Sequence, residues 1–293
     1  MSSAEVKVFQ IHYLPEQVAE LDPAFQALDN AGQNDPFFEF SVFKRLSGSP
    51  ATRGADLWGA FSWKFGQKTG LTGAQLLAFI AENPGRDVYY CNHLPELEAL
   101  FQNLWMHGET RHPGLLDVAQ AVFVKAGLDP QLCHQVAPAD LFATANFFVA
   151  TPRFWAAYLA FVESVVQPAL ADPDLGPRVL SNRADPKGIH VGASYLPFII
   201  ERLFGAFLET DEGRSFSSMQ YPVAAEKYRL NPHLRRLHQM KQAAWQTRSG
   251  WMMQCWMGYR NLYLELMNGA EWAASHLPGI SSEPISFSAP RPN

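Results

Sequence analysis

The chain has 293 residues, of which 47% are hydrophobic and 17% charged, and its formal net charge is −5. Such a composition supplies a sizeable core and excludes an intrinsically disordered protein. An acidic balance without a run of Lys or Arg argues against a nucleic-acid-binding protein, because binding to phosphates needs basic surface.

Four segments are predicted as strands. Residues 6–13 alternate apolar and polar side chains, residues 57–63 and 87–91 are apolar, β-branched or aromatic runs, and residues 147–150 form a fourth apolar run. Alternation and short apolar runs of this kind are typical of strands. Because helical patterns separate them, we expect an α/β protein in which these strands share one mostly parallel sheet.

Helices are predicted between and after the strands. Thr72 is a suitable cap for the first of them, and Pro152 suits the start of a later one, because Thr caps helices and Pro is tolerated in their first turn. The predicted helices cover residues 73–82, 95–105, 114–126, 152–166 and 197–208, and residues 233–267 form one or two more.

The pattern of elements changes along the chain. Helices and strands alternate over residues 1–215, which predicts an α/β core. Residues 216–277 predict a helical C-terminal addition packed on that core, and residues 278–293, rich in Pro and Ser without periodicity, predict a loose tail.

Cysteine usage and apolar runs indicate the cellular compartment. The three cysteines lie far apart and fit neither a disulfide framework nor a zinc site. The N-terminus has no apolar signal segment and no run of eighteen apolar residues occurs, so we expect a cytoplasmic protein. The basic residues Arg235, Arg236 and Lys241 indicate a solvated helix face or peripheral contact with an anionic membrane.

Common catalytic motifs are missing from the sequence. It contains no Gly-x-Gly-x-x-Gly, no P-loop and no Gly-x-Ser-x-Gly. Asp172-Pro-Asp174 has the spacing of a metal–diphosphate motif but lies among Pro, Ala and Gly, which predicts a surface turn. The spacing of His107, Glu109 and His112 fits no standard zinc pattern, and a helix–loop junction explains it equally well.

Three polar residues lie where plain packing does not need them. Asn146 opens an apolar run, and Glu201 with Arg202 interrupts an apolar helix. Neighbouring helical residues point about 100° apart, so these two cannot pair side by side. Two interpretations stay open: each residue has a separate structural partner, or Glu201 is a general base and Arg202 holds a phosphate or the base itself.

Four sequence blocks, in this order, resemble the GT-A-type glycosyltransferases of bacterial polysaccharide biosynthesis clusters. They are LDNAGQN at 28–34 with FEF at 38–40, LWGAFSWK at 57–64, NFFVATPRFW at 146–155 with Tyr158, and FIIERLF at 198–204. The resemblance covers residues 6–210. It implies a nucleotide-diphospho-sugar transferase-like sheet with helices on both faces, and transfer of a sugar from a nucleotide-sugar donor to a glycan or lipid-linked acceptor in surface polysaccharide synthesis.

The sequence departs from this family at the metal motif. No Asp-x-Asp ends a predicted strand; Ser62-Trp63-Lys64 ends the second and Asn92-His93 follows the third. The negative charge of a leaving diphosphate must be neutralised. Lys64 and Lys68 are near enough in sequence to do so, and we hypothesise that neutralisation is at least partly cationic. No metal ligand is assigned, and the family leaves room for a divalent Mn or Mg ion.

The residue patterns and the resemblance together give a set of candidate site residues. Glu201 is the expected base of an inverting transfer, for which partial desolvation should raise its pKa. The alternative is a non-catalytic GT-A-like scaffold or binding protein in polysaccharide assembly, which the missing Asp-x-Asp favours. The donor side comprises His12, Tyr13, Asn30, Trp63, Lys64, Lys68 and Arg202, and the acceptor side Asn146, Asn92 and His93.

Overall fold

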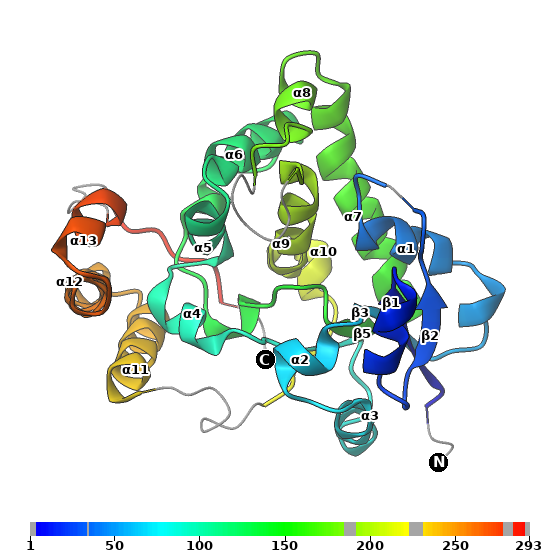
Figure 1. Ribbon diagram of the computed structural model, residues 1–293. Helices are drawn as coiled ribbons and strands as arrows, with labels where there is room; N and C mark the ends of the chain where they lie inside the picture. The colour runs from blue at the N-terminus through cyan, green and yellow to red at the C-terminus, as the bar shows by residue number, and fades with distance from the viewer. Residues whose placement is uncertain (1–3, 34, 185–191, 223–230, 278–283, 291–293) are drawn as a thin grey trace.

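The computed structural model describes residues 4–33, 35–184, 192–222, 231–277 and 284–290 (Figure 1). Six strands form one sheet in the order β2-β1-β3-β5-β4-β6. Strand β1 is parallel to both β2 and β3, β4 is parallel to β6, and β5 is antiparallel to both of its neighbours. The strands are β1 Val6–His12, β2 Gln26–Asp29, β3 Leu57–Ser62, β4 Val88–Tyr90, β5 Phe148–Ala150 and β6 Ser218–Gln220.

The four predicted strands are confirmed as β1, β3, β4 and β5, and they lie in one sheet. The sheet is mixed rather than mostly parallel in its central part, because β5 runs against both neighbours. Gly59 allows β3 and β5 to lie this close together. A Cβ at Gly59 would lie 2.6 Å from the carbonyl oxygen of Phe148, which is closer than real side chains approach.

Helices cover both faces of the sheet. Side chains of β1 alternate between the faces, with Val8 on one and Phe9 and Ile11 on the other, as the period of two in a strand requires. Helices α2 and α3 pack on the first face, and α1, α5, α6, α7 and α9 on the second. Their bounds are α1 Glu39–Leu46, α2 Phe65–Thr69, α3 Gly73–Glu82, α5 Leu104–Arg111, α6 Leu115–Lys125, α7 Pro152–Ala171 and α9 Tyr195–Glu209.

Helix α7 lies at the centre of the second face. Thr151 caps it by accepting the Phe154 amide at 3.2 Å. Trp155 stacks on Trp58 of β3 with ring centroids 4.1 Å apart, and its indole N–H donates to the Trp58 carbonyl at 2.8 Å. Among the described helices, α7 alone is long and apolar enough to cross a bilayer, yet its buried residues belong to the core.

Three helices form the C-terminal addition, at the left of Figure 1. They are α11 Pro232–Thr247, α12 Gly250–Asn268 and α13 Ala270–His276, and they share a separate apolar cluster with α4 Pro95–Leu100. Lys241 of α11 donates to the carbonyls of Glu98 and Phe101 at 2.6 and 2.9 Å. These bonds cap the end of α4 and fix the addition to the core.

The structure corrects two of the predicted boundaries. The core sheet extends beyond residue 215, because β6 pairs with β4. The tail is not loose throughout: Ser288 is 1% exposed, and its amide donates to the Val136 carbonyl at 3.1 Å. The Trp245 indole donates to the Ser288 hydroxyl at 2.9 Å, so residues 284–290 are part of the folded unit. The remaining tail residues lie outside the described part of the chain.

The shorter helices join these layers. Helix α8 follows α7, and α10 follows α9. The predicted helix over residues 95–105 is in fact two, because the chain breaks after α4 and Asn103 caps α5 by accepting the Met106 amide at 2.8 Å. The remaining helices are α8 Leu175–Val179 and α10 Asp211–Arg214, with 3-10 turns at Pro15–Glu20, Pro50–Thr52, Pro130–Cys133 and Ala139–Leu141.

Candidate functional site

A pocket of about 720 Å³ opens at the carboxyl edge of the sheet. Tyr13, Asn30 and Trp63 line it and directly follow β1, β2 and β3. The chain passes from β1 to β2 on one side and reaches β3 on the other, so the strand order reverses at β1. Ligands of open α/β sheets bind at such a reversal, outside the carboxyl ends of the strands. The pocket therefore occupies the position of a ligand site.

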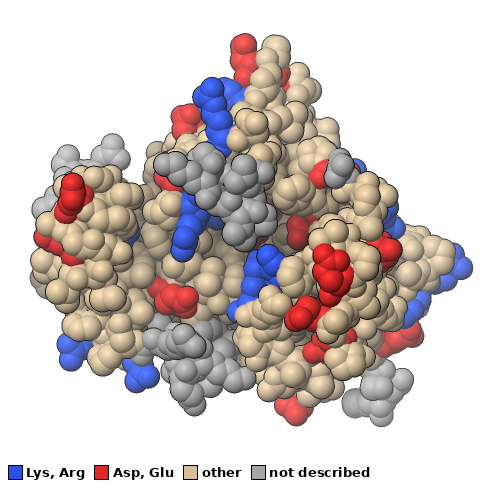
Figure 2. Space-filling view, viewed as in Figure 1, with Lys and Arg blue, Asp and Glu red and all other residues tan. Residues whose placement is uncertain are grey.

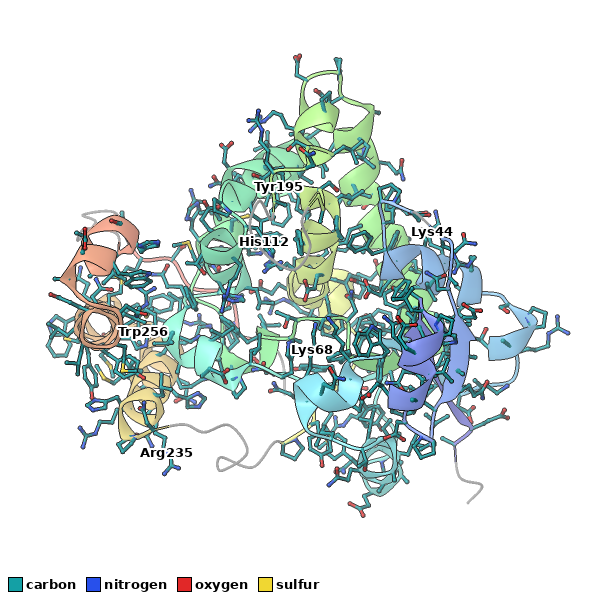
Figure 3. All side chains as sticks on the ribbon, in the orientation of Figure 1. Lys44, Lys68, His112, Tyr195, Arg235 and Trp256 are labelled. Carbon is teal, nitrogen blue, oxygen red and sulfur yellow. The ribbon has the colours of Figure 1, made fainter. Side chains whose placement is uncertain are left out.

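Four further segments wall the pocket around these strand ends. Helix α1 contributes Glu39 and Arg45, α2 contributes Lys68, α9 contributes Glu201, and the loop before β5 contributes Asn146. In Figure 3 Lys68 lies on α2 near the middle of the molecule. Figure 2 shows blue Lys and Arg side chains gathered over α2 at the centre of this face. Segments far apart in the sequence thus converge on one charged pocket.

Most of the predicted site residues meet in this pocket. Residues of both the predicted donor side and the predicted acceptor side line it. The lining residues among them are Tyr13, Asn30, Trp63, Lys64, Lys68, Asn146 and Glu201, and those outside the lining are His12, Asn92, His93 and Arg202.

Three cations belong to the pocket wall. The ammonium of Lys64 lies 5.1 Å from the ring centroid of Trp63, and that of Lys68 lies 5.8 Å from the ring of Phe147. Arg45 donates to the side-chain oxygen of Asn30. Lys68 is exposed, and both lysines are among the predicted residues, whereas Arg45 was missed. Its place in the sequence, at the end of an amphipathic helix, gave no signal beyond that of a surface charge.

Glu201 lies on the pocket wall with its carboxylate already engaged. Its Oε1 accepts the Ala145 amide at 2.5 Å, and its Oε2 lies 3.8 Å from Arg202 Nη1. Burial alone would raise the Glu201 pKa, but Arg202, Lys68, the Ala145 amide and His93 together hold it below its ordinary value. The expected rise of this pKa is therefore wrong in direction.

Glu39 is a second carboxylate in the pocket, and sequence analysis did not select it. It is the first residue of α1. Burial raises its pKa, the negative charge of Glu201 raises it further, and the residue's own backbone amide and Lys68 oppose the shift. Burial also raises the pKa of the Tyr13 phenol, to which the charge of Glu39 adds. A sequence signal existed, since Glu39 lies between two phenylalanines in one of the four blocks.

Backbone strain concentrates at this pocket. Phe38, Ala145 and Asn146 have φ angles of 50°, 64° and 55°, and all three line it. Among the described residues other than glycine, Arg248 is the fourth with positive φ and lies in the C-terminal addition. Left-handed backbone is unfavourable for residues with a Cβ and tends to cluster at ligand sites. The side-chain oxygen of Asn146 is buried and has no hydrogen-bond partner among the described residues.

The side chain of Arg202 is buried and bonded to backbone carbonyls, so it does not line the pocket where a phosphate could bind. Its guanidinium is 3% exposed and donates to the carbonyls of Leu104 and Phe198 at 3.0 and 2.7 Å. A Cβ at Gly108 would lie 2.6 Å from Arg202 Nε, so the arginine is packed tightly against α5. Its assignment to the donor side is contradicted, because the side chain points into the protein interior.

The other predicted residues outside the lining also have structural contacts. His12 is 9% exposed and is not part of the pocket lining, and its Nδ1 is buried without a hydrogen-bond partner among the described residues. The side chain of Asn92 donates to Glu98 at 3.3 Å and accepts the Leu94 amide at 2.9 Å. His93 lies against Phe147, and burial, with the charge of Lys68, lowers its pKa to about 4 despite Glu201. None of the three lines the pocket.

The part of the chain that the structure describes contains no group of three or more His, Cys, Asp or Glu side chains placed to hold a metal ion. Asp172 pairs with Lys125 at 2.7 Å and accepts the amides of the next turn, which confirms that Asp172-Pro-Asp174 is a turn. Glu109 accepts two backbone amides, and His112 stacks on a ring of α9. Asp172, Glu109 and His112 thus have structural partners.

Comparison with known proteins gives no relative for this chain. No protein-family model, no curated protein and no solved structure matches it. Only the pocket and its residues therefore bear on the function of the chain.

Proposed function

We propose that the chain is a GT-A-type glycosyltransferase that moves a sugar from a nucleotide-sugar donor to a glycan or lipid-linked acceptor. The observation that carries the proposal is the convergence of Lys64, Lys68 and Arg45 on a pocket at the carboxyl ends of parallel strands. A mixed sheet with helices on both faces is compatible with the GT-A type.

The donor side of the proposal uses the strand ends. Lys64 and Lys68 meet the diphosphate, whose negative charge grows as the sugar leaves, because fixed cations in a walled pocket stabilise developing charge. Tyr13, Asn30 and Trp63 offer aromatic surface and amide hydrogen bonds to the nucleoside. No step of the proposal depends on a metal ion.

The acceptor side lies toward α9 and the loop before β5. Asn146 lines the pocket, and its side-chain amide is of a type that can form a hydrogen bond with a sugar hydroxyl. A pocket carboxylate takes the proton from the attacking hydroxyl. Holding both substrates in one pocket supplies the orientation that sugar transfer needs.

Calorimetry with UDP, GDP and dTDP tests the donor assignment. The variants are Lys64→Ala and Lys68→Ala, and the control is Lys44→Ala, because Lys44 lies on α1 at the exposed side of the helix and pairs with Glu163 (Figure 3). A charged hydrogen bond contributes about 1.5–3 kcal/mol, so we expect each pocket variant to weaken the bound nucleotide about 10-fold or more. The control should bind as the wild type does.

Three outcomes would change the assignment. A wild-type protein that binds none of the three nucleotides contradicts the transferase proposal. Binding that is unaffected in both pocket variants removes the lysines from the site. A protein that binds nucleotide sugars and never transfers or hydrolyses them would instead be a binding protein or scaffold in polysaccharide assembly, which the missing Asp-x-Asp motif favours.

A further inference from the structure

The pocket contains three carboxylates, and their attachments differ. Asp35 accepts the Phe37 amide at 2.8 Å, and Glu201 accepts the Ala145 amide at 2.5 Å. Glu39 forms no ion pair and no side-chain hydrogen bond with another described residue. Two of the three acids are therefore committed to holding loops, and Glu39 remains available to a ligand.

Glu201 fixes the loop that carries the acceptor-side residue. The amide that it binds belongs to Ala145, and both Ala145 and Asn146 have left-handed backbone. Such backbone persists only where its surroundings hold it in place. The carboxylate of Glu201 therefore acts on the pocket through the loop, by keeping Asn146 on its wall.

Glu39 is held at the pocket by a rigid helix. Phe40 and Phe43 anchor α1 in the core, with 1% and 0% of their surface exposed. The strained backbone of Phe38, with φ 50° and ψ −124°, immediately precedes Glu39 at the start of the helix. Functional groups on anchored elements keep their geometry better than groups on loops. The position suits a group that must meet a substrate atom repeatedly.

We propose that Glu39 is the catalytic residue that accepts the proton of the acceptor hydroxyl, and that Glu201 is a positioning residue. The inference rests on the proposed transferase function. The hydroxyl oxygen forms its bond to the anomeric carbon of the donor sugar while its proton passes to the Glu39 carboxylate. The bond from the anomeric carbon to the diphosphate oxygen breaks, and its electron pair leaves with the diphosphate beside Lys64 and Lys68.

The charges that face Glu39 agree with this role. The charge of Glu201 on α9 raises the Glu39 pKa and the charge of Lys68 on α2 lowers it. The charge of Glu39 in turn raises the pKa of Tyr13, which follows β1. Burial raises the Glu39 pKa, whereas the Glu201 pKa is lowered against the effect of its burial. A base whose pKa lies nearer the working pH accepts a proton more readily in the transition state. The other charged groups lining the pocket are Asp35, Arg45 and Lys64.

The test uses the full chain and water as the acceptor. UDP-, GDP- and dTDP-hexoses are screened for binding, and release of the nucleotide from the donor that binds is followed between pH 5 and 9 for the wild type, Glu39→Gln and Glu201→Gln. The control is Glu163→Gln, because the Glu163 side chain is 41% exposed and neither it nor its partner Lys44 lines the pocket.

We expect Glu39→Gln to bind the donor as the wild type does and to lose about 100-fold or more in kcat. It should also lose the acid limb of the pH profile, which is the fall of kcat toward low pH as the base becomes protonated. Glu201→Gln should keep that limb and show weaker binding and lower thermal stability. Near-native kcat in Glu39→Gln, or loss of the acid limb only in Glu201→Gln, would overturn the inference while the transferase proposal stands. A wild type that binds a donor yet releases no nucleotide overturns it too, and one that binds no donor contradicts both.

Discussion

Replacement of Glu201 with Ala should release the loop that carries Asn146. In the wild type, the Glu201 carboxylate accepts the Ala145 amide at 2.5 Å, and the φ angles of Ala145 and Asn146 are 64° and 55°. A hydrogen bond to a charged group contributes about 1.5–3 kcal/mol. Left-handed backbone costs an L residue about 1–2 kcal/mol. The two magnitudes are comparable, so the loop keeps its conformation only while the carboxylate holds it.

The expected effect is a local one. The Arg202 contact spans 3.8 Å and is not a hydrogen bond, and Arg202 keeps its bonds to the Leu104 and Phe198 carbonyls, so its loss should affect the loop little. Loss of the hydrogen bond should lower the free energy of opening the loop by about 2 kcal/mol, which corresponds to about 30-fold faster amide exchange.

Hydrogen exchange measured by mass spectrometry on peptides covering residues 143–150 checks this expectation. Glu201→Gln should give an intermediate rate, since its amide oxygen still accepts the Ala145 amide, and Glu163→Ala should leave the loop unchanged. Equal protection of this loop in the wild type and in Glu201→Ala would refute the reasoning.

Two further predictions concern stability. Burial lowers the Lys241 pKa from 10.5 to about 8, so between these pH values the unfolded state binds more protons than the folded state. The free energy of unfolding should therefore rise with pH across this window. Urea titrations of Lys241→Met should show no such rise. The same slope in both proteins would show that another group titrates. Gly59→Ala would place a Cβ 2.6 Å from the Phe148 carbonyl oxygen, and it should cost about 1–3 kcal/mol of unfolding free energy. A wild-type denaturation midpoint would show that β3 and β5 can move apart.

The fold was predictable where the chain is strongly patterned. Strands β1, β3, β4 and β5 are apolar or aromatic enough to be seen in the sequence, and the Thr72 capping box marks α3. Strands β2 and β6 were missed because they are short and their residues are exposed or half-buried, so neither forms an apolar run. Both are strands because they pair with a neighbouring strand. The packed tail, including Ser288, depends on long-range contacts that no local pattern encodes.

The site was predictable where strand ends define it. Tyr13 and Lys64 come at the ends of the strands predicted over residues 6–13 and 57–63, and both line the pocket. Asn30 lines it too, but it follows β2, which was not predicted, and it was selected only from the resemblance. Whether a helical side chain faces the pocket or the core was harder to read, and Arg202 proved to be packed inside. The role proposed for Glu39 depends on the positive φ of Phe38 and on burial in the folded chain, and neither can be read from the sequence.

A crystal structure of the chain grown with saturating UDP, GDP or dTDP tests the central claim most directly. We predict a bound nucleotide with its diphosphate within hydrogen-bond reach of Lys64 and Lys68 and its nucleoside against Tyr13 and Asn30. A nucleotide bound elsewhere, or a pocket that stays empty with all three, would contradict the assignment of this pocket as a nucleotide-sugar site.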